Sequence, residues 1–138
     1  RIIVVSSMTH QGAELDPRDL ALSHNWSGYG AYATSKLANV FFTRTLAERI
    51  WGSNTTANAL HPGVIGTKLL RSSFGMGGGP VEDGARTPVF LATSPEVAGV
   101  TGQYFVDCRP KKPSRAARNA NLAEALWSST ESIPTEFL

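Results

Sequence analysis

Cysteine is nearly absent from this sequence of 138 residues, and its scarcity excludes two kinds of site. Because Cys108 stands alone, the chain can form neither an internal disulfide nor a metal site built from several cysteines. A single cysteine also fits a reducing compartment, so we expect a cytoplasmic protein.

An excess of charge of one sign and long apolar runs are also missing. The 13 basic and 11 acidic residues leave a formal net charge of +2, which is too small for the electrostatic footprint of a nucleic-acid binder. No apolar run approaches the roughly 18–20 residues of a membrane-spanning helix. We therefore expect no nucleic-acid partner and no membrane span. Apolar residues still make up 41% of the chain, enough for one compact domain with a hydrophobic core.

Two chemistries that use histidine lack their accompanying motifs. His10 and His24 do not have the spacing of metal ligands, so we expect no metal site. His61 suggests a Ser-His-Asp hydrolase, but the sequence has no Gly-x-Ser-x-Gly elbow, and Ser35 lies inside a predicted helix. We therefore interpret His61 as a structural residue at the end of a strand.

Strand and helix patterns alternate along the chain, as is typical of α/β proteins. Strands are predicted at residues 1–7, 56–61 and 102–107, and helices at residues 31–50, 84–93 and 121–128. Two segments are predicted to be loops: the polar residues 8–31, with a helical turn near Pro17, and the glycine-rich residues 68–83. Strand, helix, strand, helix, strand is the order of parallel βαβ units, so we expect three parallel strands with crossover helices.

The first predicted strand begins at once, with no preceding turn. Its run of Ile and Val residues, from Ile2 to Val5, is typical of a strand buried on both faces inside a parallel sheet. A domain rarely starts with its most buried strand. We therefore expect that a longer protein continues before Arg1, and that a neighbouring strand lies beside this one.

The clearest chemical feature is the run from Tyr32 to Lys36 in the first predicted helix. Residues four apart lie on one helix face, so the phenol and the ammonium are neighbours, and a cation beside a phenol favours its ionised form. A phenol in this setting can exchange a proton with a carbonyl or an alcohol oxygen. Two further features, Ser6-Ser7 and Pro62-Gly63, follow predicted strands and so lie at the same sheet edge, where α/β proteins place reactive groups.

These motifs, in this order, resemble the short-chain dehydrogenase/reductase family. The resemblance is carried by a strand that ends in Ser-Ser and by the patterns Tyr-x-x-x-Lys, Asn-x-x-x-Pro-Gly and Thr-Gly-x-Tyr-Phe. Three finer features are similar to the retinol-dehydrogenase-like branch, which includes the WW-domain-containing oxidoreductases. They are the 25-residue gap between Ser7 and Tyr32, the run Ser-Lys-Leu-Ala-Asn-Val from Ser35, and Leu-His-Pro-Gly ending at Gly63.

The resemblance covers nearly the whole chain, from Arg1 to about Trp127. It implies that residues 1–138 are the C-terminal catalytic portion of one domain, without the N-terminal dinucleotide-binding half. The implied fold is the C-terminal half of a Rossmann-like doubly wound parallel sheet.

The resemblance also implies roles for three catalytic residues. Tyr32 matches the general acid/base, and Lys36 matches its cationic partner, which in this family also binds the nicotinamide ribose. Ser7 matches the hydroxyl that holds the substrate oxygen; Ser6 fits less well, because the family's serine is the last one before the loop.

A second group of residues is implied to contact the cofactor. Pro62 and Gly63 match the turn that packs under the nicotinamide, while the backbone of Ile65 and the hydroxyl of Thr67 match groups that meet its carboxamide. The implied reaction passes a hydride between NAD or NADP and a small alcohol, aldehyde or ketone, which is lipophilic in this branch. Family members commonly form homodimers or homotetramers.

Some of the family's parts are missing from these 138 residues. There is no Gly-x-x-x-Gly-x-Gly turn for the pyrophosphate, and the family's catalytic asparagine would precede the first strand. Two hypotheses therefore stand. The chain is the catalytic segment of an NAD(P)-dependent oxidoreductase, or it is a truncated, non-catalytic module that binds another chain through its exposed strand edge or its helices.

Overall fold

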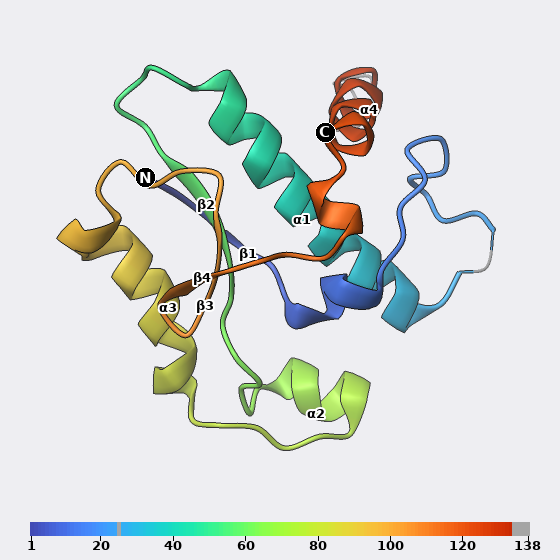
Figure 1. Cartoon of the computed structure of the whole chain (residues 1–138). Helices are drawn as coiled ribbons and strands as arrows, with labels where there is room; N and C mark the ends of the chain where they lie inside the picture. The colour runs from blue at the N-terminus through green and yellow to red at the C-terminus, as the bar shows by residue number, and fades with distance from the viewer. Residues whose placement is uncertain (25, 134–138) are drawn as a thin grey trace.

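The computed structural model describes residues 1–24 and 26–133 (Figure 1). Within these ranges the strands are β1 (Ile2–Val5), β2 (Ala57–His61), β3 (Tyr104–Val106) and β4 (Arg109–Lys111). The α-helices are α1 (Gly28–Arg49), α2 (Lys68–Phe74), α3 (Val81–Thr93) and α4 (Ala120–Glu131). Three short 3-10 helices complete the described part: η1 (Met8–Gly12), η2 (Pro95–Val97) and η3 (Ala116–Arg118).

The strands form one sheet in the order β1-β2-β3-β4. β1, β2 and β3 are parallel, which confirms the three predicted parallel strands. β4 is antiparallel to β3 and was not predicted. It follows a two-residue turn in which Asp107 and Cys108 both have positive φ, of 49° and 58°, as a type I′ hairpin requires.

Consecutive residues of the central strands point to opposite faces of the sheet, and each face has its own core. Ala59 and Tyr104 belong to a cluster with Leu37 and Phe41 of α1. Their chain neighbours Leu60 and Phe105 join a second cluster with Leu91 of α3. The sheet is therefore a middle layer, with α1 and α4 on one face and α3 on the other (Figure 1).

The residues at the ends of helix α1 determine where it begins and ends, and its buried side chains determine how it packs on the sheet. The hydroxyl of Ser27 accepts a hydrogen bond from the backbone N–H of Gly30, which satisfies one of the free donors at the helix start. The helix ends at Arg49, and Gly52 follows it with a φ of 84°. Leu37 and Phe41 have no exposed surface, so the helix is fixed against the sheet along the side that carries them.

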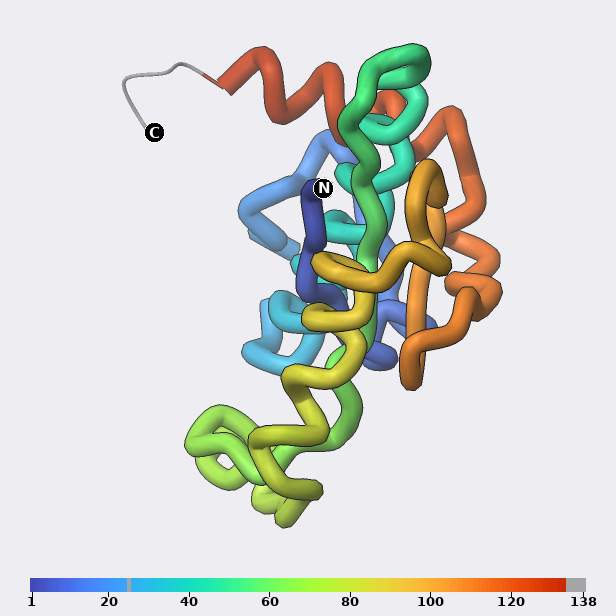
Figure 2. Tube along the Cα trace, turned by 90° about the vertical axis from the view of Figure 1, so that its left-hand side faces the viewer, coloured from blue at the N-terminus to red at the C-terminus, as the bar shows by residue number. Residues whose placement is uncertain are grey.

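The prediction of a loop over residues 68–83 was wrong in part, because α2 forms there. Thr67 caps this helix by accepting a hydrogen bond from the N–H of Leu70, and Gly75 ends it with a φ of 62°. Helix α3 also begins earlier than predicted, at Val81. Figure 2 shows α2 and the chain after it projecting beyond the end of the sheet.

The loop predicted over residues 8–31 contains η1 at its start and the first turn of α1 at its end. Asn25, which falls in this loop, lies outside the described residues. The expectation that β1 is buried on both faces was wrong for this chain: Ile2 is 36% exposed and Val5 is 45% exposed. The reason is that β1 is the outermost strand of the sheet. Among the described residues, no helix combines the length and apolarity needed to cross a bilayer.

Candidate active site

The carbonyl of Val5, at the end of β1, is the point where the predicted catalytic helix meets the sheet. The ammonium of Lys36 donates to this carbonyl at 3.2 Å, and the amide Nδ2 of Asn39 donates to it at 3.1 Å. In return the hydroxyl of Ser6 donates to the backbone carbonyl of Lys36 at 2.7 Å. These contacts fix α1 directly beside the Ser6-Ser7 pair.

Tyr32 and Lys36 lie one helical turn apart on α1, as the spacing predicts. The Lys36 Nζ lies 5.5 Å from the centre of the Tyr32 ring, and both residues are partly buried. This is the distance of a cation–π contact. The ammonium therefore has two neighbours, a phenol and the last carbonyl of a strand.

The two serines differ in how their hydroxyl groups are used. Ser6 is 2% exposed, and its hydroxyl proton is committed to the Lys36 carbonyl. Ser7 is 6% exposed and is the N-cap of η1, where its hydroxyl oxygen accepts from the N–H of Thr9 at 3.3 Å. A hydroxyl that accepts still has its own proton to donate. This difference favours Ser7 over Ser6 as a donor to a substrate oxygen.

The segment Pro62–Thr67 leaves the sheet next to these serines. The N–H of Ser6 donates to the carbonyl of Leu60 at 2.7 Å, so the ends of β1 and β2 lie side by side. Gly63 has a φ of 100°, which favours glycine at this turn. Pro62 and Gly63 are partly buried, whereas Thr67 is exposed and caps α2.

A short parallel bridge between Ile65 and Gly79 holds this segment in place. The N–H of Gly66 donates to the Gly79 carbonyl and the N–H of Gly79 donates to the Val64 carbonyl, both at 2.8 Å. The contact is so close that a Cβ on Gly78 would lie 2.7 Å from three backbone atoms. The Ile65 side chain packs toward Gly84 of α3. The backbone carbonyl of Ile65 accepts a hydrogen bond from the N–H of Thr67 at 2.7 Å.

Phe74 of α2 connects this segment to the tyrosine. Its ring meets the ring of Tyr32 edge-on, with centroids 5.7 Å apart, and also meets Tyr29 at 6.0 Å. Sequence reasoning missed Phe74 because it treated residues 68–83 as a loop. The cap Thr67 and the terminating Gly75 are the signals that identify the helix carrying it.

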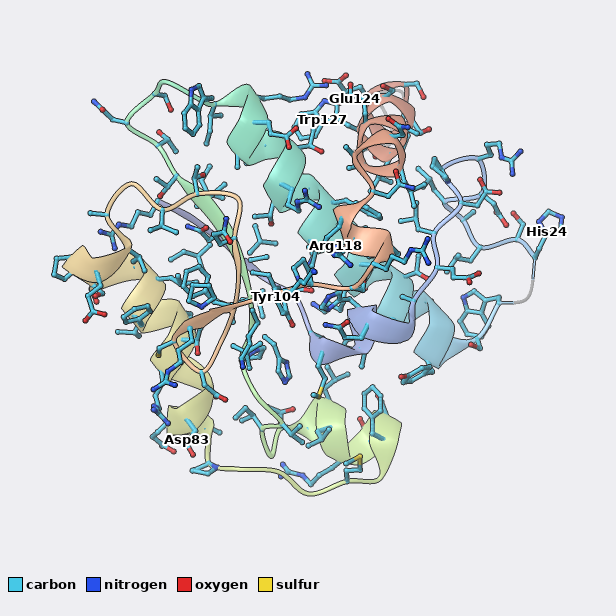
Figure 3. The ribbon with its side chains drawn as sticks, viewed as in Figure 1. His24, Asp83, Tyr104, Arg118, Glu124 and Trp127 are labelled. Carbon is cyan, nitrogen blue, oxygen red and sulfur yellow. The ribbon has the colours of Figure 1, made fainter. Side chains whose placement is uncertain are left out.

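His10 and Tyr104 form a buried pair of polar side chains next to Ser7. His10 has no exposed surface, and its ring lies edge-on to Tyr104 with centroids 4.8 Å apart. Burial raises the pKa of Tyr104 to about 12, and its hydroxyl finds no hydrogen-bond partner among the described residues. Figure 3 shows Tyr104 near the middle of the molecule.

The three histidines differ in their surroundings, and His10 and His61 are close enough to interact electrostatically. Burial lowers the pKa of His61, at the end of β2, and the charge of Asp107 opposes this shift. His24 lies on the exposed loop, far from Tyr104 in Figure 3, with its Nδ1 3.1 Å from Asp19. Within residues 1–24 and 26–133, no group of three His, Cys, Asp or Glu side chains is placed to hold a metal ion.

The structure thus places Tyr32 and Lys36 beside each other on α1 and bonds Lys36 to Val5 and Ser6, the two residues that precede Ser7. Residues 62–67 leave β2 at the same edge and lead into α2, whose Phe74 lies against Tyr32. Residues 4–108 match a family model described as Enoyl-(Acyl carrier protein) reductase, and this match covers more than half of the chain. The chain belongs to the short-chain dehydrogenase/reductase family.

Curated relatives in this family of oxidoreductases include several dehydrogenases. Human retinol dehydrogenase 14 is 39% identical to this chain over 95% of this chain's length. Human retinol dehydrogenase 12 is 36% identical and human polyprenol dehydrogenase 37% identical, each over 93% of the chain. The chain spans 43% of each of these relatives, less than half of their length.

Two solved structures share the short-chain dehydrogenase/reductase fold with this chain. An uncharacterized protein from Mycobacterium Paratuberculosis superimposes with a TM-score of 0.77, at 31% identity, over 95% of this chain and 48% of the other. A short chain dehydrogenase from Pseudomonas syringae superimposes with a TM-score of 0.53, at 24% identity, over 75% of this chain and 38% of the other. The predicted α/β fold is confirmed.

Proposed function

We propose that the complete protein in which this chain occurs is an NAD(P)-dependent oxidoreductase that interconverts an alcohol and a carbonyl compound. In this proposal residues 1–138 are the C-terminal catalytic portion of one domain. Tyr32 is the general acid/base, Lys36 its cationic partner, and Ser7 the hydroxyl that holds the substrate oxygen. The observation that carries the proposal is the placement of the Lys36 ammonium, 5.5 Å from the Tyr32 ring and bonded to the last carbonyl before Ser6-Ser7.

The acid/base step follows from the chemistry of these three side chains. During reduction of a carbonyl, the Tyr32 hydroxyl gives its proton to the substrate oxygen, and during oxidation of an alcohol the phenolate takes the proton back. The Ser7 hydroxyl donates a hydrogen bond to the same oxygen and so fixes its position. The Lys36 ammonium stabilises the negative charge that develops on Tyr32.

The residues at this edge of the sheet fit the nicotinamide end of a dinucleotide. Lys36 has three N–H groups and uses one on Val5, which leaves two for ribose hydroxyls. Gly63 has no Cβ to obstruct a flat ring, and the Thr67 hydroxyl still has a proton to donate, because in capping α2 it only accepts. Pro62 and the backbone of Ile65 complete the proposed contact surface. When bound, the cofactor supplies or takes up the hydride.

A small lipophilic alcohol, aldehyde or ketone is the proposed substrate class. Its apolar part would meet Phe74, which already lies against Tyr32. The names of two relatives, retinol dehydrogenase and polyprenol dehydrogenase, also describe enzymes of alcohols. NAD(P) is the cofactor that this family generally uses, and the residues present do not select between NAD and NADP.

A non-catalytic role is the second candidate, and it rests on the exposed edge of β1. β1 is the outermost strand, and its Ile2 and Val5 are partly exposed. An open apolar strand edge can pair with a strand of another chain. In the first proposal the same edge pairs with the rest of the sheet of the complete enzyme, so both proposals use this surface.

Titration of the complete protein with NADH and NADPH, followed by nicotinamide fluorescence, separates the two candidates. The oxidoreductase proposal expects saturable binding of at least one nucleotide and turnover of a small lipophilic alcohol. A protein that binds neither nucleotide and runs as a complex with another chain in size-exclusion chromatography would support the non-catalytic role instead.

A further inference from the structure

The imidazole of His10 bonds through both of its nitrogens, and this fixes where its proton lies. The Nδ1 atom is 2.6 Å from the backbone carbonyl of Ser7, and the backbone N–H of Ser114 donates to Nε2 at 3.2 Å. A backbone N–H can only donate, so Nε2 is the acceptor and Nδ1 carries the proton. His10 is therefore a neutral ring that donates to the Ser7 carbonyl.

The surroundings keep His10 in this state. Burial lowers its pKa, and the hydrogen bond to Ser7 only partly opposes that shift. The ring of Tyr104 packs against the imidazole in a T-shaped arrangement, and the Ser114 hydroxyl accepts from the N–H of Ala117 at 3.1 Å. Ser114, whose N–H donates to Nε2 of His10, is itself buried, with 6% of its surface exposed.

We propose that His10 is a positioning residue for Ser7, an inference that rests on the function proposed above. The residue before Ser7 is held by the Ser6 N–H, which donates to the Leu60 carbonyl, and by the Ser6 hydroxyl, which donates to the Lys36 carbonyl. The peptide after Ser7 is held at its carbonyl by His10. Together these bonds hold the backbone on both sides of Ser7, and the Thr9 N–H holds its hydroxyl oxygen.

The contacts of His10 distinguish this role from two others. Its Nδ1 bonds the Ser7 backbone carbonyl, not the hydroxyl, so His10 does not act as a base toward that hydroxyl. Both ring nitrogens are engaged, which leaves no lone pair for a metal ion. His10 acts through Ser7, and a misplacement of a catalytic group by about 1 Å is enough to slow a reaction roughly 100-fold.

Two substitutions separate the two hydrogen bonds of the ring. In His10→Asn the amide nitrogen stands where Nδ1 stood, so the donor to Ser7 is kept and the acceptor for Ser114 is lost. In His10→Gln the amide group reaches the place of Nε2, so the acceptor is kept and the donor is lost. We expect His10→Gln to lower kcat of the complete protein at least about tenfold, and His10→Asn to stay within about threefold.

The decisive test is a double substitution. If His10 acts through Ser7, then Ser7→Ala/His10→Gln has the same kcat as Ser7→Ala alone, because the group that His10 positions is already gone. A further drop in the double variant, by the factor seen for His10→Gln alone, would show a general structural role and overturn the proposal.

One measurement needs no variant. The ¹⁵N chemical shifts of the His10 ring in the wild-type protein report which nitrogen is protonated, and a proton on Nε2 would overturn the proposal. Failure of the proposed function is recognised separately, since a wild type that turns over no alcohol with either nucleotide ends both proposals. An active wild type with a non-coupled double variant ends only this one.

Discussion

Gly78 is the position where the packing of residues 62–67, proposed above to contact the cofactor, can be tested most directly. A Cβ there would lie 2.7 Å from the Gly66 nitrogen, the Ile65 carbonyl carbon and the Val64 oxygen, all backbone atoms. Gly78→Ala must therefore open the bridge between residues 64–66 and Gly79. The bridge has two hydrogen bonds of 2.8 Å, each worth about 1 kcal/mol net, so its loss is worth about 2 kcal/mol.

Amide hydrogen exchange measures this loss. A local destabilisation of about 2 kcal/mol makes the Gly66 and Gly79 amides exchange roughly 30-fold faster in Gly78→Ala than in wild type. Gly77→Ala is the matched control, because a Cβ on Gly77 would meet no atom within 4 Å. Its exchange rates are expected to stay within about threefold of wild type. Equal exchange in the two variants would refute the described packing.

Two further predictions concern acid stability and substrate binding. Burial lowers the pKa values of His10 and His61 from 6.5. The unfolded chain therefore binds protons below pH 6.5 that the folded chain does not. The free energy of unfolding then decreases as the pH decreases, by at most about 1.4 kcal/mol per histidine per pH unit. The urea midpoint measured between pH 7.5 and 5.5 checks this, and an unchanged midpoint would contradict it. Phe74→Ala is expected to raise KM for a lipophilic alcohol about tenfold with kcat nearly unchanged, because it removes an apolar wall but no acid or base. Phe74→Leu serves as the control in steady-state kinetics, and a fall in kcat alone would argue against this role.

The features that the sequence reveals are local ones. Tyr32 and Lys36 are four residues apart, and that spacing alone places them on one helix face. The apolar run of β1 predicts its strand directly, Pro62-Gly63 marks the end of the β2 strand, and the order of elements predicts their parallel pairing. The Ser6-Ser7 pair follows from the same local pattern, because it ends the predicted strand, whereas the choice of Ser7 over Ser6 comes from the family resemblance.

The missed features depend on contacts between distant segments or on weak local signals. His10 bonds Ser114, 104 residues away, and no pattern near His10 indicates that contact. β4 has only three residues, all exposed, and its middle residue is Pro110, so it lacks the alternation of a buried strand. Helix α2 is different, since Thr67 and Gly75 are ordinary cap residues that the glycine content of residues 68–83 obscured.

The rate of the complete protein with Tyr32→Phe tests the central claim most directly. The substitution keeps the ring and its contact with Phe74 but removes the hydroxyl that moves the proton. Tyr29→Phe is the matched control, because Tyr29 is on the same helix and also lies edge-on to Phe74. We predict that kcat for alcohol oxidation falls at least about 100-fold in Tyr32→Phe and stays near wild type in Tyr29→Phe, with NADH affinity nearly unchanged in both. A Tyr32→Phe protein that turns over at the wild-type rate would contradict the account.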